Sequence, residues 1–376
     1  MSRSRLLTVL LALFGFMFVG AARAEPGLLI GAAEDAGKSL SPQVSKAKMD
    51  LARAAGFNAV RLTTIWSPGQ TAPSGPELTV LGNAANAAQA DGIRVILSVY
   101  QWGSSTTPVT PQARWQFASF CAALARALPS VRDFIIGNEP NLNRFWLPQF
   151  TANGGDAAAR DYEALLAQTY DALKSVSGSI TVIGGSVSPR GEDDPHSSRQ
   201  THSPTAFIAD VGRAYRSSGR TLPLMDEFAF HPYEDNSSLP PTFAHPNSTT
   251  IAIADYDKLR ALLGGAFDGT AQRGSSLPIL YDEFGVESRA PAGHGYSGSE
   301  PPTTHAVDEA TQGAYYANAF AMACKQPTVA GILIFHVSDE ARLDRWQSGV
   351  YYADDAPKSS LPIVQQGIQA VRTGAC

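Results

Sequence analysis

Residues 93–137 read IRVILSVYQWGSSTTPVTPQARWQFASFCAALARALPSVRDFIIG, and this stretch decides the fold. Its two ends, 93–100 and 131–137, are short apolar runs rich in β-branched residues, which is typical of buried strands. Between them Thr110 precedes Pro111, the pairing of an N-cap residue with proline at the first helical position. An apolar stripe at helical spacing follows, formed by Phe117, Cys121, Leu124 and Leu128. The stretch therefore predicts a strand, a helix and a second strand.

The same alternation extends along the chain in both directions. Eight apolar runs can be counted, at 28–32, 57–65, 93–100, 131–137, 180–187, 224–231, 278–284 and 329–337. Runs of this kind are typical of parallel strands buried on both faces, with helices as the crossovers. Eight strands with eight crossovers predict a single (β/α)8 TIM barrel over residues 25–376.

Two further helix starts support this pattern. Ser41 precedes Pro42 and Ser203 precedes Pro204, as Thr110 precedes Pro111. We expect the first helix to end at Gly56 and to bury the stripe Val44, Ala47, Leu51 and Ala55.

An open, doubly wound sheet is the competing architecture. Such a sheet usually carries a glycine-rich phosphate turn after its first strand. Here the glycines of Gly27-Leu28-Leu29-Ile30-Gly31 fall within a predicted strand and do not fit that turn. Long polar segments follow three of the strands, at 188–204, 234–250 and 288–307. In a barrel these are long βα-loops on the face that holds the active site.

The N-terminus has the features of a secretory signal peptide. Arg3 and Arg5 precede an apolar run over 6–20, and Ala22-Arg23-Ala24 offers a cleavage site before Glu25. A membrane anchor is the alternative, but the run is shorter than the ~20 residues that span a bilayer. We therefore expect a secreted protein, extracellular or periplasmic, that has no membrane association after cleavage of residues 1–24.

An exported chain meets an oxidising compartment, where cysteines pair. The three cysteines admit a Cys324–Cys376 bridge with Cys121 buried, or no disulfide at all. The formal charge of −5 and the lack of a basic stripe argue against nucleic acid as a partner. We expect a monomer.

Two glutamates lie at the ends of apolar strands, and they are the candidate catalytic residues. Glu139 follows the fourth strand in Phe134-Ile135-Ile136-Gly137-Asn138-Glu139-Pro140-Asn141, and Glu283 ends the seventh in Tyr281-Asp282-Glu283-Phe284-Gly285. Both positions belong to the mouth of a barrel, where an unpaired buried carboxylate is costly. A reaction that needs two carboxylates and no cofactor is glycoside hydrolysis. By strand alternation, we expect Asp282 to point away from Glu283, toward the outer face of the barrel.

These residues resemble glycoside hydrolase clan A, especially families 5 and 39. The resemblance covers the eight strands and rests on Asn138-Glu139-Pro140, Glu283-Phe284-Gly285, Arg61 at the end of the second strand and His231-Pro232-Tyr233 after the sixth. It implies a retaining glycosidase acting on an oligosaccharide or polysaccharide, without metal or other cofactor. The linkages implied are β-pyranosidic, as in glucans, xylans or mannans, and α-L-arabinofuranosides remain open.

The resemblance also implies a role for each residue. Glu139 is the general acid/base and Glu283 the nucleophile, Asn138 binds the hydroxyl next to the anomeric carbon, and Arg61 keeps Glu283 ionised. His231 and Tyr233 line the same pocket, with Tyr233 reaching the nucleophile.

One position departs from the clan pattern. Many members have a tryptophan at the end of strand eight, whereas this chain has Phe335-His336-Val337. The remaining candidates for contact with the sugar are Trp66, Trp102, Trp146, His336 and Trp346, of which Trp346 is the candidate to replace the missing tryptophan. Apolar packing under a loop accounts equally well for each tryptophan.

Two other functions compete with a glycosidase. A carbohydrate-binding barrel without turnover keeps the architecture, but the presence of both glutamates disfavours it. A metal-dependent hydrolase would use His231 and His336, although no His-x-His or His-Glu-x-x-His spacing accompanies them.

Overall fold

The structure is a computed structural model that describes residues 27–376. In this part of the chain, eight parallel strands close into a barrel in sequence order, and β1 pairs with β8. The strands are β1 (Leu29–Ala33), β2 (Ala59–Trp66), β3 (Arg94–Gln101), β4 (Asp133–Ile136), β5 (Thr181–Val187), β6 (Glu227–Phe230), β7 (Ile279–Phe284) and β8 (Val329–Phe335). This confirms the predicted (β/α)8 barrel and the position of each strand.

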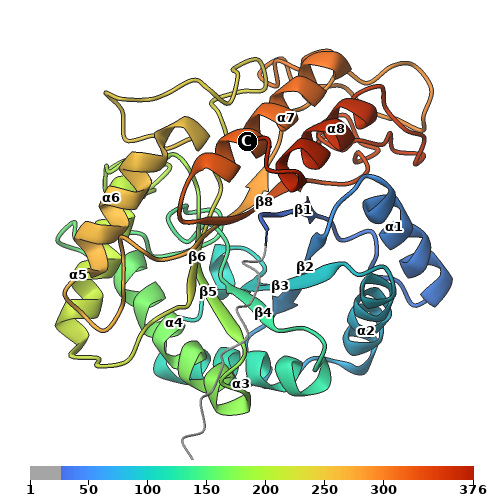
Figure 1. Cartoon of the computed structure of the whole chain (residues 1–376). Helices are drawn as coiled ribbons and strands as arrows, with labels where there is room; N and C mark the ends of the chain where they lie inside the picture. The colour runs from blue at the N-terminus through green and yellow to red at the C-terminus, as the bar shows by residue number, and fades with distance from the viewer. Residues whose placement is uncertain (1–26) are drawn as a thin grey trace, which may run out of the picture.

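Helices follow the strands and surround the barrel (Figure 1). They are α1 (Pro42–Ala54), α2 (Gly75–Ala90), α3 (Pro111–Ala127), α4 (Ala157–Val176), α5 (Pro204–Ser218), α6 (Tyr256–Phe267), α7 (Glu309–Lys325) and α8 (Leu361–Arg372), with short 3-10 turns at Ser104–Thr106 and Ile253–Asp255. Ser41, Thr110 and Ser203 each accept a hydrogen bond from a backbone N–H of the first turn, as predicted for N-caps. None of these helices has the length and apolar character needed to cross a bilayer.

The buried stripe of α1 differs from the predicted one. Ser45, Met49 and Ala52 face the core, while Val44 is exposed. Ala55 of the predicted stripe is buried and Leu51 packs against the core, so the prediction is confirmed at the end of the helix. It is wrong at Val44 and Ala47, which are exposed, whereas Met49 is buried. In α3 the predicted stripe is buried as expected.

The barrel interior is built in layers that follow strand alternation. Its middle layer is apolar and takes one residue from each strand: Leu29, Ala59, Ile96, Ile135, Ile183, Ala229, Leu280 and Leu333. Two residues before this layer, at the N-terminal end, Arg94 of β3 forms an ion pair with Asp133 of β4 beside buried Glu227. Two residues after it, at the C-terminal end, lie four buried polar side chains of the site described below: Arg61, Ser98, His231 and Asp282.

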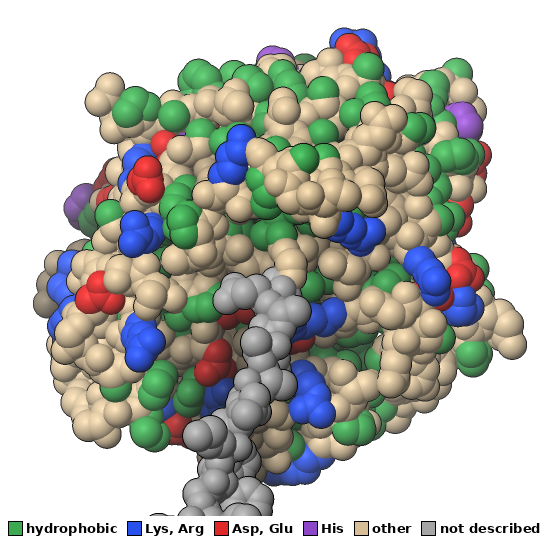
Figure 2. Space-filling model, in the orientation of Figure 1, with side chains coloured by type: hydrophobic (Ala, Val, Ile, Leu, Met, Phe, Trp, Pro, Cys, Tyr) green, Lys and Arg blue, Asp and Glu red, His purple; other side chains and the backbone are tan. Residues whose placement is uncertain are grey.

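The charged surface is mixed. Figure 2 shows Lys and Arg side chains scattered among Asp and Glu on the face in view, without a continuous basic stripe there. The leader predicted for residues 1–24 lies outside the described residues.

A disulfide joins the last two helices. Cys324 near the end of α7 is bonded to Cys376, which follows α8, and Cys121 is buried and unpaired. The pairing is one of the two arrangements that the sequence left open. It ties the C-terminus to the barrel wall.

Loss of this bridge should weaken the fold without changing the site. Removing a native disulfide costs about 2–4 kcal/mol, so dithiothreitol should lower the thermal midpoint of the native protein. The double variant Cys324→Ser, Cys376→Ser should start from the lower midpoint and be insensitive to dithiothreitol. An equal response of both proteins to the reductant would show that the bridge does not carry this stability.

Candidate active site

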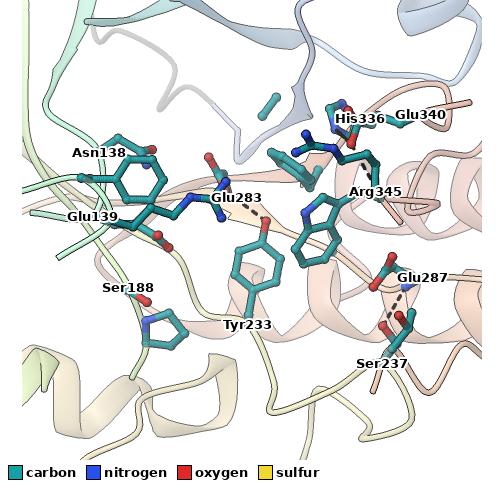
Figure 3. A pocket seen from close by; sticks show the side chains of 18 of the residues that line it. Asn138, Glu139, Ser188, Tyr233, Ser237, Glu283, Glu287, His336, Glu340 and Arg345 are labelled. Atoms are coloured by element: carbon teal, nitrogen blue, oxygen red, sulfur yellow. Dashed lines mark hydrogen bonds and ion pairs between the residues drawn. The ribbon is translucent and has the colours of Figure 1, made fainter. Parts of the chain in front are cut away.

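A pocket of about 740 Å³ opens at the C-terminal ends of the strands, and both predicted catalytic glutamates line it. Asn138, Tyr233, His336 and Arg61 also line it, as do Trp102 and Trp346. Figure 3 shows Asn138 and Glu139 on one side of Glu283 and Tyr233, with His336 on the other. The barrel therefore gathers in one place most of the residues that the sequence singled out.

Arg61 lies at the centre of a buried polar layer that it forms with Ser98, His231 and Asp282. It is the third residue of β2, not a strand-end residue as predicted, and its side chain reaches the mouth from below. One terminal nitrogen donates to Oε1 of Glu283, and the other donates to Ser98 Oγ at 3.2 Å and to Asn138 Oδ1 at 3.1 Å. Burial alone opposes the charge, but the carboxylates of Glu283 and Asp282 outweigh it and raise the pKa of Arg61.

Glu283 is held through both oxygens. Arg61 donates to Oε1, and the hydroxyl of Tyr233 donates to Oε2 at 3.1 Å. Burial and the negative charges of Glu283 and Glu139 raise the pKa of Tyr233 well above its usual value, so this hydroxyl keeps its proton. The predicted contact between Tyr233 and the nucleophile candidate is present.

Glu139 is placed by an unusual backbone conformation. Its φ of 39° lies in the left-handed region that residues other than glycine rarely adopt, which is a frequent feature of functional sites. Its N–H donates to the carbonyl of Ser186 at 2.8 Å, and Oε1 lies 3.1 Å from Nδ1 of His231. The same nitrogen is 3.6 Å from Oε2 of Glu283, so His231 stands between the two glutamates.

His231 is fully buried behind the pocket and is held on both ring nitrogens. Its Nε2 lies 2.9 Å from Ser186 Oγ and 3.3 Å from Asp282 Oδ2. Burial disfavours the imidazolium, but the carboxylates of Glu283 and Asp282 more than compensate and raise the pKa of His231 to about 10. His231 is therefore a cation at neutral pH.

The side chain of Asp282 points inward, contrary to the prediction. The expected outward orientation is wrong, because Asp282 is fully buried and accepts a hydrogen bond from Ser186 Oγ at 2.9 Å. It lies two residues after Leu280 of the inner apolar layer, so alternation itself points it inward. The β7–β8 register shifts between Tyr281 and Phe284, and there Glu283 also turns toward Arg61. His231 and Arg61 lower the pKa of Asp282 against the effect of burial.

Sequence reasoning also missed Ser186. The β5–β6 register shifts between Gly185 and Val187, and Ser186 has a φ of 52°. This bulge places the hydroxyl between His231 and Asp282. The pair Gly184-Gly185 within a strand was the available signal, since glycine in a strand often marks a bulge.

Two predicted sugar contacts are wrong. Trp66 and Trp146 are almost fully buried and do not line the pocket. Trp66 packs against Phe117 of α3, and Trp146 packs against Tyr162 of α4. Both tryptophans close the layer between the barrel and its helices, so they belong to the core.

Trp102 and Trp346 do lie at the pocket. Trp102 is 76% exposed at the rim, whereas Trp346 packs against Tyr233 with ring centroids 5.3 Å apart. Trp346 also contacts Phe335 at the end of β8, which places it where the missing strand-eight tryptophan was expected to act.

The two histidines proposed as metal ligands are not brought together. The ring nitrogens of His231 contact Ser186, Asp282 and Glu139, whereas His336 lies beside Glu34 and Glu340 at 3.9 and 3.8 Å. Among residues 27–376, no three His, Cys, Asp or Glu side chains are grouped as a metal site requires.

The charge of His231 should depend on Asp282. In Asp282→Asn the imidazolium loses an anionic partner, so its pKa should fall well below 10. Because the folded pKa exceeds the ordinary 6.5, the stability that this group contributes is present below about pH 6.5 and is lost as pH rises through 10. Histidine NMR titration from pH 6 to 11 measures the pKa, with His231→Gln to assign the signal. An unchanged titration in Asp282→Asn would contradict this account.

Comparison with known proteins identifies the family. Residues 31–290 match the family model described as cellulase (glycosyl hydrolase family 5). No curated protein sequence matches the chain.

Solved structures resemble the fold at low identity. A GH39 enzyme from Xanthomonas axonopodis pv. citri is 15% identical, with a TM-score of 0.57 over 92% of this chain and 67% of its own. A variant of GH5_18 from Streptomyces cattleya, in complex with Manb1-4GlcNAc, is 16% identical, with a TM-score of 0.60 over 92% and 81%. The exo-beta-1,4-mannosidase Op5Man5 from Opitutaceae bacterium strain TAV5 is 14% identical, with a TM-score of 0.59 over 93% and 60%.

The family model covers well over half of the chain, and the barrel presents two glutamates at its mouth. The chain is therefore a glycosidase that belongs to glycosyl hydrolase family 5, a retaining family of clan A.

Proposed function

We propose that the protein cleaves glycosidic bonds by double displacement, with Glu283 as the nucleophile and Glu139 as the general acid/base. The observation that carries this proposal is the shared contact with His231. One ring nitrogen lies 3.1 Å from Glu139 and 3.6 Å from Glu283, so the carboxylates are close neighbours with different partners. Retaining enzymes hold their two carboxyl groups about 5–5.5 Å apart.

The partners separate the two roles. Arg61 donates to one oxygen of Glu283 and Tyr233 donates to the other. Together they compensate a negative charge on Glu283, as a nucleophile requires. Glu139 lies on the other side of His231, and no arginine among residues 27–376 forms an ion pair with it. Two cations, Arg61 and His231, balance the two anions Asp282 and Glu283, so the group of five is neutral when Glu139 carries a proton.

This balance persists during the first step. Glu283 attacks the anomeric carbon, the bond to the leaving oxygen breaks, and that oxygen takes the proton of Glu139. Glu283 becomes a neutral ester as Glu139 becomes an anion, so the number of charges in the group does not change. In the second step Glu139 takes a proton from water, the resulting hydroxide oxygen bonds to the anomeric carbon, and Glu283 leaves as a carboxylate.

Asn138 has a defined orientation for binding. Its Oδ1 accepts from Arg61, so the amide NH2 is the group left for a ligand in the pocket. We assign to it the hydroxyl next to the anomeric carbon. Trp346 and Trp102 supply apolar faces for sugar rings, one beside Tyr233 and one at the rim.

We propose β-linked oligosaccharides or polysaccharides as substrates, acted on by a secreted monomer. The disulfide supports an oxidising compartment, and the leader predicted for residues 1–24 provides for export. The Streptomyces cattleya structure holds a mannosyl disaccharide and Op5Man5 is a mannosidase, so β-mannosides are tested first, followed by glucans and xylans.

Glu283→Gln should abolish turnover on every substrate, because an amide cannot form the covalent intermediate. The assay is sugar release from aryl β-glycosides and polysaccharides by residues 25–376. Retained saccharide binding and an intact thermal transition serve as the folding control. Equal turnover by Glu283→Gln and the native protein would refute the assigned nucleophile, and saccharide binding by a native protein without turnover would favour a binding barrel.

Glu139→Gln should discriminate between leaving groups. Oligosaccharides need protonation of the leaving oxygen, so their cleavage should slow by about 10²–10⁴. The glycosylation step with 2,4-dinitrophenyl glycosides needs little protonation and should change far less. An equal loss on both kinds of substrate would contradict the role of Glu139.

A further inference from the structure

Glu287 lines the same pocket, four residues after Glu283, and has no catalytic role in the mechanism above. The side chain is half-buried. Among residues 27–376, no side chain donates a hydrogen bond to its carboxylate. The hydrogen bond to Ser237 comes from the backbone N–H of Glu287, and the carboxylate itself accepts from the backbone of Gln347. The remaining acceptor sites of this partly desolvated carboxylate are open to hydroxyl groups of a ligand in the pocket.

The backbone on either side of this carboxylate is clamped by three loops. Its N–H donates to Ser237 Oγ at 2.9 Å, as Figure 3 shows, and its carbonyl accepts from Val307 at 3.0 Å. The next N–H, that of Ser288, donates to the carbonyl of Gln347 at 3.1 Å. The loops after β6, β7 and β8 therefore fix the position from which the side chain of Glu287 projects.

A buried ion pair supports this clamp from below. Lys358 is almost fully buried and donates to Ser288 Oγ at 2.9 Å and to Asp339 Oδ1 at 2.8 Å. Tyr296 from the β7 loop donates to the other oxygen of Asp339 at 2.5 Å. A buried pair of this kind has little net benefit for stability, but it fixes geometry.

The position of Glu287 relative to the catalytic pair assigns it to one side of the scissile bond. Figure 3 shows Glu139 and Glu287 on opposite sides of Glu283 and Tyr233. The ring of Trp346 packs against Tyr233. In the proposed function Glu139 protonates the leaving oxygen, so Glu287 lies on the glycone side. Four residues of extended chain span at most about 13 Å, which is within reach of the far edge of one sugar ring or of the next ring.

We infer that Glu287 is a specificity-determining residue, whose carboxylate accepts hydrogen bonds from hydroxyl groups of a neutral sugar on the glycone side. This inference rests on the proposed function. Vicinal hydroxyls match the two oxygens of a carboxylate, and a planar acceptor held by its backbone binds them at little entropic cost.

The charges around the pocket favour a neutral sugar. Eight carboxyl side chains and four arginines line it, and two of those arginines, Arg61 and Arg190, already contact acidic partners. Burial raises the pKa of Glu287 to about 7, and Glu300 and Asp339 act in the same direction while the backbone of Gln347 and the charge of Lys358 oppose them. A uronic acid would add another carboxylate beside these groups.

The test compares Glu287→Gln with native enzyme on the best neutral 4-nitrophenyl β-glycoside, chosen from mannoside, glucoside and xyloside, and on the glucuronide. We expect KM to rise roughly tenfold or more in the variant while kcat stays within about threefold. We also expect the native KM to fall as pH rises through about 7, where Glu287 ionises, and this dependence to vanish in the variant. The glucuronide should be a far poorer substrate than the neutral glycosides.

Glu192→Gln is the matched control, because Glu192 is an exposed glutamate of the loop after β5 that lies outside the pocket and does not influence the pKa of Glu287. It should keep the native KM. An unchanged KM in Glu287→Gln, an equal rise in Glu192→Gln, or preference for the glucuronide would overturn the inference. If the native enzyme cleaves none of these glycosides, the proposed function itself is refuted, so the two failures are distinguishable.

Discussion

The buried guanidinium of Arg61 is the interaction on which the site depends. It is 3% exposed, and a cation so far from water must be paired and hydrogen-bonded. Its donors reach Ser98 of β3, Asn138 after β4 and Glu283 of β7. The requirement to satisfy one charge therefore fixes the relative positions of three strand ends. The candidate nucleophile and the amide of Asn138 are placed by the same guanidinium.

The polar layer around Arg61 is tolerated because the layer below it is dry. One apolar residue from each strand closes the barrel interior beneath the site. Asp282, His231 and Ser98 each follow an apolar interior residue by two positions, so the pleat that packs the core also aims these side chains. In the resulting low-dielectric setting, charges influence one another strongly, and His231 becomes a cation between its carboxylates.

The fold could be predicted because its signals are local. Continuous apolar runs and three Ser/Thr-Pro helix starts identify the strands and crossovers directly, and Glu139 and Glu283 stand out because they end such runs. Asp282 could not be placed by counting from Glu283, since the register shift in β7 breaks alternation between them. The sequence does not distinguish Trp66 and Trp146 from Trp346. Only the packing of the folded chain shows that the first two belong to the core and that Trp346 lies at the pocket.

The positions of the pocket residues in the loops could not be predicted from sequence patterns. His336 follows β8, close to the position at which the clan resemblance led us to expect a tryptophan, and its φ is 74°. Trp346 lies in the following loop and packs beside Tyr233. Glu287 is held by backbone contacts with the loops after β6 and β8 and with the far end of its own loop. Such long-range contacts carry no periodicity, so they become visible only in the folded chain.

The covalent bond between Glu283 and the sugar is the step that distinguishes the proposed mechanism from its alternatives. The most direct measurement is peptide mapping by mass spectrometry after incubation with 2-deoxy-2-fluoro-β-mannosyl and -glucosyl fluorides, which slow the second step more than the first. We expect one fluoroglycosyl group per chain, attached to Glu283 and absent in Glu283→Gln. A label on another residue, or turnover with inversion and no adduct, would contradict it.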